Sequence, residues 1–170
     1  MKKIVAAVLL SAVAALPAYA DNGSYAGVKA GSANAGFNGL SKSSDTSYGL
    51  ILGYQYNRNL AVEGEYADLG RFTTATGITG RSNVWGLNAV GSMPLDSNFS
   101  AYGKLGLTRS NTRTSAATGI RRTAVGYGLG GQYEATPMIG IRLGWERYGV
   151  GVAGQNARDD LYSLAAMFRF

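Results

Sequence analysis

The fold class is decided by the stretch Tyr162-Ser163-Leu164-Ala165-Ala166-Met167-Phe168-Arg169-Phe170. Alternate side chains of an extended strand share one face. On one face of this stretch lie the residues Tyr162, Leu164, Ala166, Phe168 and Phe170. A soluble protein rarely exposes such an apolar strand, because its free edge promotes aggregation, whereas the closing strand of a membrane barrel has a neighbour on each side and lipid outside. The stretch therefore predicts the last strand of a transmembrane β-barrel.

The first twenty residues have the layout of a secretory signal peptide. Two lysines precede an apolar run over residues 4–16, and Ala18-Tyr19-Ala20 then supplies small residues at the positions that a signal peptidase reads. The alternative is an amino-terminal membrane anchor, but the run is shorter than the roughly 20 apolar residues that span a bilayer. We expect residues 1–20 to be a signal peptide that is cleaved after export by the Sec route, and residues 21–170 to form the barrel.

Composition narrows the classes of function that remain. The chain has 16 basic and 10 acidic side chains, and loss of Lys2 and Lys3 with the signal leaves 14 against 10, a net charge of +4. These charges are scattered rather than clustered on one face, so they do not predict a nucleic-acid partner. Cysteine and histidine are both absent. Backbone pairing rather than disulfides must hold the fold, and we predict no metal, no cofactor and no enzyme, because the commonest metal ligand and general base are missing.

The mature chain is patterned as a series of strands. After residue 16 no stretch is apolar for long enough to be a membrane helix. Period-two alternation instead predicts eight strands of about ten residues each, which suits a tilted crossing of the hydrocarbon layer. They cover residues 24–33, 46–56, 60–69, 83–93, 99–108, 123–133, 138–148 and 162–170. Short turns alternate with long polar loops between them, as in an up-and-down antiparallel barrel.

The two faces of these strands distinguish a membrane barrel from a soluble one. Large apolar residues share one face, and the charged residues share the other face with glycine. An eight-stranded membrane barrel places large residues outside in lipid and small ones inside, because it encloses little space. The alternative, a soluble lipocalin-type barrel with a central ligand, should carry its larger apolar residues inside. Aromatic residues near the strand ends match interfacial girdles: Tyr54, Tyr56, Tyr66, Trp85, Phe99, Tyr133, Trp145 and Phe170.

Short motifs follow one another along the mature chain. They are Tyr25-x-Gly27-x-Lys29-x-Gly31, Glu63-x-x-Tyr66-x-x-Leu69-Gly70-Arg71, Tyr102-x-Lys104-Leu105-Gly106, residues 130–137 with Arg142-Leu143, and Phe168-Arg169-Phe170. In this order they resemble the strands of the OmpA-like transmembrane β-barrel family. The resemblance implies a location in the outer membrane of a Gram-negative bacterium. Many members carry a periplasmic peptidoglycan-binding domain after the barrel, but here we expect the barrel-only, OmpX-like architecture, because the sequence stops at Phe170.

The resemblance also implies a role for charged residues of inward parity. In OmpA-like barrels a carboxylate–guanidinium pair crosses the lumen and is treated as part of a gate, and Glu63 and Arg142 match it. The lysine and glutamate that offer alternative partners in that gate correspond here to Val90 and Gln132, which argues against switching. Further charges of inward parity are Glu65, Lys104, Glu146 and Lys29. They are expected to extend the network, since confined charges need partners; the alternative is that these ions only satisfy one another and hold the barrel closed.

Four long polar connections should lie outside the cell, because the amino terminus and the short turns mark the periplasmic side. They cover about residues 34–45, 70–82, 109–122 and 149–158. The third is basic, with Arg109, Arg113, Arg121 and Arg122. Guanidinium groups bind phosphate in a bidentate manner, so this loop is a candidate contact for lipopolysaccharide phosphates. The alternative is ordinary solvated loop charge.

The competing class is a lipid-modifying outer-membrane enzyme. Such barrels resemble serine hydrolases or acyltransferases that activate a hydroxyl with histidine, and this sequence has no histidine. Asp159 and Asp160 form the only adjacent acidic pair. Neighbouring residues of a strand point to opposite faces, so these two carboxylates cannot readily converge on one substrate.

The sequence thus predicts an all-β, eight-stranded antiparallel barrel that inserts as a monomer among outer-membrane lipid and lipopolysaccharide. Its expected role is structural or in surface interaction, with at most a narrow, porin-like conductance gated by ion pairs. The alternative is an adhesin, or a protein that binds lipopolysaccharide or a host factor through its loops. Periplasmic chaperones and the barrel-assembly machinery are the expected partners in biogenesis, since Phe168-x-Phe170 resembles the signal that this machinery reads.

Overall fold

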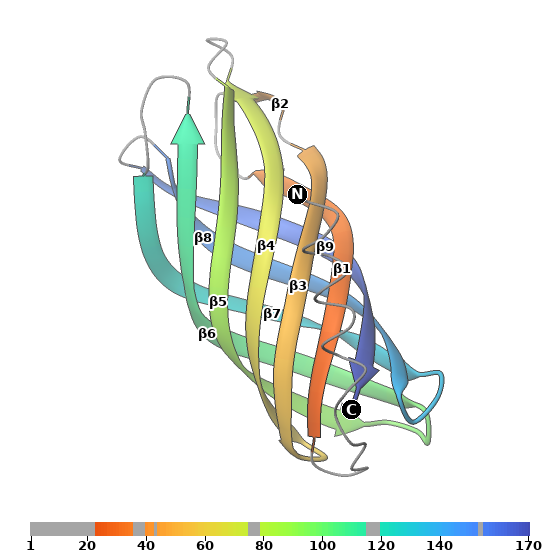
Figure 1. The fold of residues 1–170 in the computed structure, drawn as a ribbon. Coiled ribbons are helices and arrows are strands. Elements are labelled where there is room, and N and C mark those ends of the chain that lie inside the picture. The colour runs from red at the N-terminus through yellow and green to blue at the C-terminus, as the bar shows by residue number, and fades with distance from the viewer. Residues whose placement is uncertain (1–22, 36–39, 43, 75–78, 115–119, 153–154) are drawn as a thin grey trace, which may run out of the picture.

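The computed structural model describes residues 23–35, 40–42, 44–74, 79–114, 120–152 and 155–170. Eight long strands form one antiparallel sheet (Figure 1): β1 Gly23–Ala35, β3 Ser44–Asn57, β4 Leu60–Thr74, β5 Thr79–Pro94, β6 Phe99–Thr114, β7 Ile120–Glu134, β8 Ile139–Val152 and β9 Gln155–Arg169. A short strand, β2 (Leu40–Lys42), pairs with β4. The described residues include no helix that is long and apolar enough to cross a membrane. The signal peptide expected at residues 1–20 lies outside the described residues.

The sheet closes on itself. Each long strand pairs with the long strands before and after it in the chain, and the first and last strands pair from Tyr25 with Arg169 to Ala35 with Asp159. The closing strand β9 therefore has β1 on one side and β8 on the other. Closure removes the free edges that make an open sheet prone to aggregation. The predicted eight-stranded antiparallel barrel is confirmed.

The barrel is apolar outside and polar inside, the reverse of a soluble protein. Leu52, Leu87 and Leu107 are each more than 60 % exposed, whereas Glu63 and Lys104 on the inner face are almost fully buried. A soluble protein would lose stability by exposing such leucines to water. In a bilayer the same side chains face hydrocarbon, so the exterior is stable there.

Glycines on the inner face make room for two tyrosine rings that fill the lumen. A Cβ atom at Gly53 would lie 2.2 Å from the ring of Tyr25. A Cβ atom at Gly144 would lie 2.2 Å from the hydroxyl oxygen of Tyr102. Both tyrosines are about 95 % buried. These small inward residues therefore accommodate large inward side chains from other strands.

Short turns connect the strands at the end of the barrel where Phe170 lies. In the β3–β4 turn, the side-chain oxygen of Asn57 accepts hydrogen bonds from the backbone amides of Asn59 and Leu60, at 2.9 and 2.8 Å. In the β5–β6 turn, the amide of Leu95 donates to the carbonyl of Phe99 at 2.8 Å. Short turns mark the periplasmic end of such barrels. The opposite end, which includes Ala35 and Asp159, is therefore extracellular.

The strands continue further toward the extracellular end than the sequence predicts. β6 runs to Thr114 and β7 begins at Ile120, so Arg109, Arg113, Arg121 and Arg122 lie in strands and not in the expected loop. Similarly, β2 occupies part of the expected 34–45 loop. The prediction ended each strand where apolar residues stop, but pairing depends on the backbone. Polar residues can continue it: Thr112 and Ser82 face inward and their hydroxyl groups lie 3.2 Å apart.

One pair of strands separates before the extracellular end. The β6–β7 and β8–β9 ladders reach Thr112–Ile120 and Val152–Gln155. The β7–β8 ladder stops at Tyr127–Arg147. The extracellular parts of β7 and β8 therefore face one another along residues 120–126 and 148–152 without ladder hydrogen bonds, and we call this segment the β7–β8 seam.

Candidate functional site

The periplasmic half of the lumen holds an ion pair with hydrogen-bonding partners. Arg142 on β8 reaches across to Glu63 on β4, with Nη1 2.5 Å from Oε1. The Arg142 Nε–H also donates to the side-chain oxygen of Gln132 at 2.9 Å. The hydroxyl of Tyr25 donates to the same Glu63 oxygen at 2.6 Å. The Arg142 guanidinium lies over the ring of Tyr102, 4.5 Å from its centroid. It therefore combines an ion pair, a hydrogen bond and an aromatic contact.

A second cluster fills the middle of the lumen. Lys29 on β1 contacts Glu146 on β8 at 2.5 Å, and Lys104 on β6 contacts the other oxygen of Glu146 at 2.6 Å. Lys104 also contacts Glu65 on β4, which lies 3.5 Å from Lys29. The hydroxyl oxygen of Tyr148 accepts a hydrogen bond from the Lys29 ammonium at 3.0 Å. It also lies within hydrogen-bonding distance of Glu65 and Glu146, and its one hydrogen can be donated to either carboxylate. Two ammonium groups and two carboxylates thus form one ion-pair network, in which each group contacts both groups of opposite charge.

Both clusters are electrically neutral and closed in by apolar side chains. The first pairs one positive with one negative charge, and the second pairs two with two. On the extracellular side lies an apolar cluster of Ala33, Ala67, Leu69, Val84, Tyr148 and Leu161. Around the first ion pair lies the apolar cluster of Tyr25, Ile51, Ala61, Val90, Tyr102, Ala165 and Met167. A buried pair of this kind is costly to desolvate but more costly to break, so the lumen favours a fixed arrangement.

The sequence identified the charged members of these clusters but not the tyrosines that hold them. Tyr25, Tyr102 and Tyr148 are at most 5 % exposed, and each contacts a charged group of the lumen. Tyr25 and Tyr102 stand at inward parity opposite the glycines that accommodate them. A large aromatic residue at inward parity in a small barrel is the signal that could have found them.

Outside the barrel, arginines gather at the extracellular ends of β5, β6 and β7. We call Arg81, Arg109, Arg113 and Arg121 the arginine face; all four have exposed side chains. The register places Arg81 directly opposite Arg113, Arg121 opposite Asn111, and Arg109 opposite Trp85. Trp85 packs on Tyr66, with ring centroids 4.7 Å apart, as part of the aromatic girdle. The arginine face therefore begins at the membrane boundary and extends above it.

Pairing within the arginine face is incomplete. Arg81 donates to Asp68 on β4, with Nε 3.1 Å from Oδ1. Arg109, Arg113 and Arg121 have no ion-pair partner among the described residues. Three strongly basic groups are thus held near one another on a rigid sheet without a carboxylate to neutralise them. The fourth arginine of the expected basic loop, Arg122, lies on the inward side of β7, away from this face.

The acidic pair Asp159–Asp160 is divided between the two sides of the barrel wall. Asp160 faces outward and forms an ion pair with Arg147, with Nε 2.6 Å from Oδ1. Asp159 faces inward, is 6 % exposed, and its Oδ1 has no hydrogen-bond partner among the described residues. Because Asp160 marks the end of the apolar exterior on β9, Asp159 lies above the membrane-spanning segment. Burial and then the charge of Asp160 raise the pKa of Asp159 to about 7.

A closed antiparallel barrel with an apolar belt, aromatic girdles and a charged interior defines a transmembrane β-barrel protein. The described residues hold no cluster of three acidic, histidine or cysteine residues that could bind a metal. The family model for the outer membrane protein beta-barrel domain matches residues 4–170. The chain belongs to this family and is located in the outer membrane of a Gram-negative bacterium. No curated protein matches the chain.

Solved structures with the same fold come from several Gram-negative bacteria. The chain is similar to Neisserial surface protein A (TM-score 0.68, 19 % identity, covering 86 % of this chain and 97 % of that one). It is similar to Ail of Yersinia pestis, solved with the heparin analogue sucrose octasulfate (TM-score 0.62, 22 % identity, 89 % and 100 %). A third is the barrel domain of OprF of Pseudomonas aeruginosa (TM-score 0.60, 15 % identity, 86 % and 97 %). At these identities the similarity shows the fold alone.

Proposed function

We propose that this outer-membrane barrel is a surface-interaction protein that binds phosphate- or sulfate-bearing glycans, including lipopolysaccharide, at the arginine face, while its lumen stays closed. The observation that carries the proposal is the set of three exposed arginines, Arg109, Arg113 and Arg121, without an ion-pair partner among the described residues. Like charges held close together repel one another. A polyanion removes that repulsion and gains several charge-assisted hydrogen bonds at once.

The position of the arginine face favours a ligand at the membrane surface. Arg109 lies beside Trp85 of the girdle, and Arg113 lies further along β6, toward the extracellular end. The ligand would therefore contact arginines from the lipid boundary upward, as a phosphorylated glycolipid does. The structure of Ail with a sulfated sugar supports the idea that this fold can present such a surface, and the proposal for this chain rests on its own arginines.

A binding assay tests the proposal. The barrel is embedded in phospholipid nanodiscs, and heparin binding is measured at increasing salt concentration. Replacement of Arg109, Arg113 and Arg121 by glutamine should weaken binding at least about tenfold and flatten its dependence on salt. The lysine triple variant keeps the charge but loses bidentate geometry, so it should fall between the two. Arg58→Gln at the periplasmic β3–β4 turn is the control and should bind as the wild type does; equal binding by the glutamine triple variant would refute the proposal.

The closed lumen is the second part of the proposal. Neutral ion clusters packed between apolar side chains leave little reason for ions to enter, since a permeating ion would have to displace paired charges. We expect the barrel to produce no discrete openings in planar bilayers. Arg142→Ala removes the largest side chain of the lower cluster and should allow brief openings if water fills the space. Wild-type openings of stable size would instead support an ion-conducting role gated by Glu63 and Arg142.

The proposal also covers enzymatic activity, export and assembly of the barrel. An enzymatic role is not included, because the two neighbouring carboxylates Asp159 and Asp160 face opposite sides of the wall. Export through a signal peptide at residues 1–20 and monomeric insertion are part of the proposal. So is recognition of Phe168 and Phe170, whose ring centroids lie 6.4 Å apart, by chaperones and the barrel-assembly machinery. Deletion of Phe170 should reduce the amount of folded barrel in the outer membrane.

A further inference from the structure

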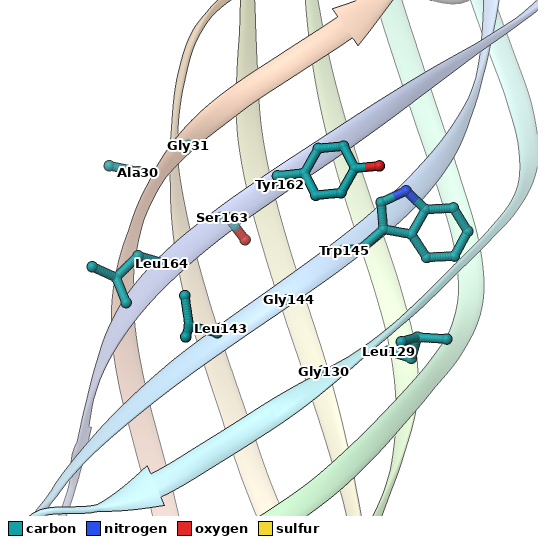
Figure 2. Close-up of a pocket in the computed structure, with 10 residues that line it drawn as sticks. All are labelled: Ala30, Gly31, Leu129, Gly130, Leu143, Gly144, Trp145, Tyr162, Ser163 and Leu164. Carbon is teal, nitrogen blue, oxygen red and sulfur yellow. The ribbon is translucent and has the colours of Figure 1, made fainter.

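A groove crosses the lipid-facing surface of the barrel over β7, β8, β9 and β1. Figure 2 shows two rows of side chains that border it: Leu129, Trp145 and Tyr162 in one row, and Leu143, Leu164 and Ala30 in the other. Its floor is the backbone of residues whose side chains are absent or point inward, such as Gly144 and Ser163. The groove is an open depression of the barrel exterior with a volume of about 550 Å³.

The register explains why the groove has this shape. Trp145 pairs with Tyr162, and Leu143 pairs with Leu164, so each row runs across the strands in the direction of the hydrogen bonds. Leu164 also pairs with Ala30 on β1. Many other exterior positions carry leucine or tyrosine, but Ala30 is small. The row of Leu143, Leu164 and Ala30 therefore projects least from the surface at Ala30. A flexible hydrocarbon chain fits an apolar groove of this kind, since it gains contact with leucine on both sides.

The polar side chains that border the groove, as opposed to its floor, lie on the extracellular side. The indole nitrogen of Trp145 and the hydroxyl of Tyr162 have no hydrogen-bond partner among the described residues, and both belong to the upper row (Figure 2). Two residues further along β8, Arg147 places its guanidinium 5.1 Å from the ring centre of Trp145 and pairs with Asp160. The site therefore has an apolar part in the membrane and hydrogen-bond donors at the outer interface, where Trp and Tyr normally contact headgroups.

We propose that this groove binds one acyl chain of lipopolysaccharide, with the phosphorylated sugar of lipid A against the donors of Trp145, Tyr162 and Arg147. The source of the chain follows from the position: the donors lie at the extracellular end, and lipopolysaccharide forms the outer leaflet of the membrane in which this family resides. A phospholipid would be expected at the periplasmic end instead. This site is separate from the arginine face, which lies on β5, β6 and β7, whereas the polar end of the groove lies on β8 and β9.

The two tryptophans of the chain allow a direct test. Trp85→Phe leaves only Trp145, at the groove, and Trp145→Phe leaves only Trp85, beside the arginine face. Each variant is placed in nanodiscs made of phospholipid with brominated acyl chains, which quench tryptophan fluorescence on contact, and lipopolysaccharide is titrated in. Binding of lipopolysaccharide in the groove should displace the brominated chains and relieve the quenching of Trp145.

Groove-filling variants then assign the effect to the site. Ala30→Leu, in the Trp85→Phe background, should raise the lipopolysaccharide concentration needed for half of the relief roughly tenfold, because it displaces about two methylene groups from the groove. Ala89→Leu makes the same change on the exterior of β5, away from the groove, and should have no effect. Leu143→Ala, which shortens one border of the groove, is a second test that adds no bulk and should also weaken binding.

The outcomes separate this inference from the proposed function. Relief at Trp145 should persist when Arg109, Arg113 and Arg121 are replaced by glutamine, whereas any relief at Trp85 should disappear in that variant. Quenching of Trp145 that lipopolysaccharide does not change, or that changes equally in the Ala30→Leu and Ala89→Leu variants, would overturn the acyl-chain site. Weak quenching of Trp145 before any lipopolysaccharide is added, together with dimers in analytical ultracentrifugation, would show that a second copy covers the groove and would also overturn it.

Discussion

The lumen and the arginine face use the same side chain in opposite ways. Arg142 is 7 % exposed, paired with Glu63, bonded to Gln132 and stacked on an aromatic ring. Arg113 is exposed and has no ion-pair partner among the described residues. A charge that is surrounded by partners fixes the packing around it, whereas a charge without partners is available to a ligand. In this barrel the interior charges therefore explain the structure, and the exterior charges are the better candidates for function.

The largest expected effect comes from breaking the interior pair. Arg142→Gln leaves the carboxylate of Glu63, which is fully buried, with the hydroxyl of Tyr25 as its remaining strong donor. Loss of one partner of a buried pair costs about 3–5 kcal/mol. Urea unfolding of the barrel in detergent micelles, followed by tryptophan fluorescence, measures the loss.

The matching double variant shows whether the loss belongs to the pair. Glu63→Gln together with Arg142→Gln removes both charges, and should be more stable than Arg142→Gln alone, because no unpaired charge is left buried. If Arg142→Gln lost less than about 1 kcal/mol, the interior charge would be as dispensable as an exposed one, and the lumen and the arginine face would not differ in how they use arginine.

The next effect depends on pH and involves Asp159, an interior charge without a basic partner among the described residues. Its native pKa, raised to about 7, lies above its ordinary value of 3.8, so the folded state binds a proton more tightly than the unfolded state. Stability at this end is therefore highest below about pH 4 and falls as the pH rises to about 7, by roughly 4 kcal/mol at full ionisation. Asp159→Asn should abolish this pH dependence and make the barrel more stable than the wild type at pH 8.

Unfolding curves at pH 4.5 and pH 8 provide the measurement. Asp96→Asn in the exposed β5–β6 turn is the control, and it should leave the difference between the two pH values unchanged. If the wild type and Asp159→Asn lost the same stability between these pH values, Asp159 would not be the group that titrates.

The comparison of lumen and exterior also shows which parts of the structure could be predicted from sequence. The alternation of apolar and small residues was sufficient for the barrel and for the inward position of Glu63 and Arg142, because period two is a direct consequence of strand geometry. The cross-lumen contacts of Lys29 and Lys104 with Glu146 join residues far apart in the chain, and parity alone could not assign which cation meets which carboxylate. Strand parity indicated only that these three side chains face inward.

The extracellular end was harder to predict for a physical reason. Above the membrane both faces of a strand are polar, so hydropathy no longer alternates although backbone pairing continues. Ser110 and Thr112 in β6 are fully buried, but as hydroxyl residues they resembled a loop in the sequence. The basic site was predicted with three of its members, Arg109, Arg113 and Arg121. For the same reason it was placed in a loop, which gave no basis for adding Arg81 or for separating Arg122 from the others.

The β7–β8 seam allows a test of local stability that involves no charge. Backbone amides that point into the seam, along residues 120–126 and 148–152, lack ladder partners across it. They should exchange hydrogen faster than the amides between β5 and β6, whose ladder extends to Gly80 and Thr114. Nuclear magnetic resonance of the barrel in nanodiscs resolves the individual amides. Equal protection on the two sides would mean that β7 and β8 pair to their ends in the membrane.

The smallest effect is expected for Arg81→Gln, which makes the same change as Arg142→Gln but at the arginine face. Arg81 is paired with Asp68, yet its side chain is 61 % exposed, so water competes with the carboxylate and salt screens the pair. Exposed pairs of this kind contribute about 0.2–1 kcal/mol. The same urea unfolding assay should therefore show a loss below about 1 kcal/mol that shrinks further in high salt. A loss as large as that of Arg142→Gln would mean that the exterior arginines stabilise the barrel, and would weaken the case that they are available to a ligand.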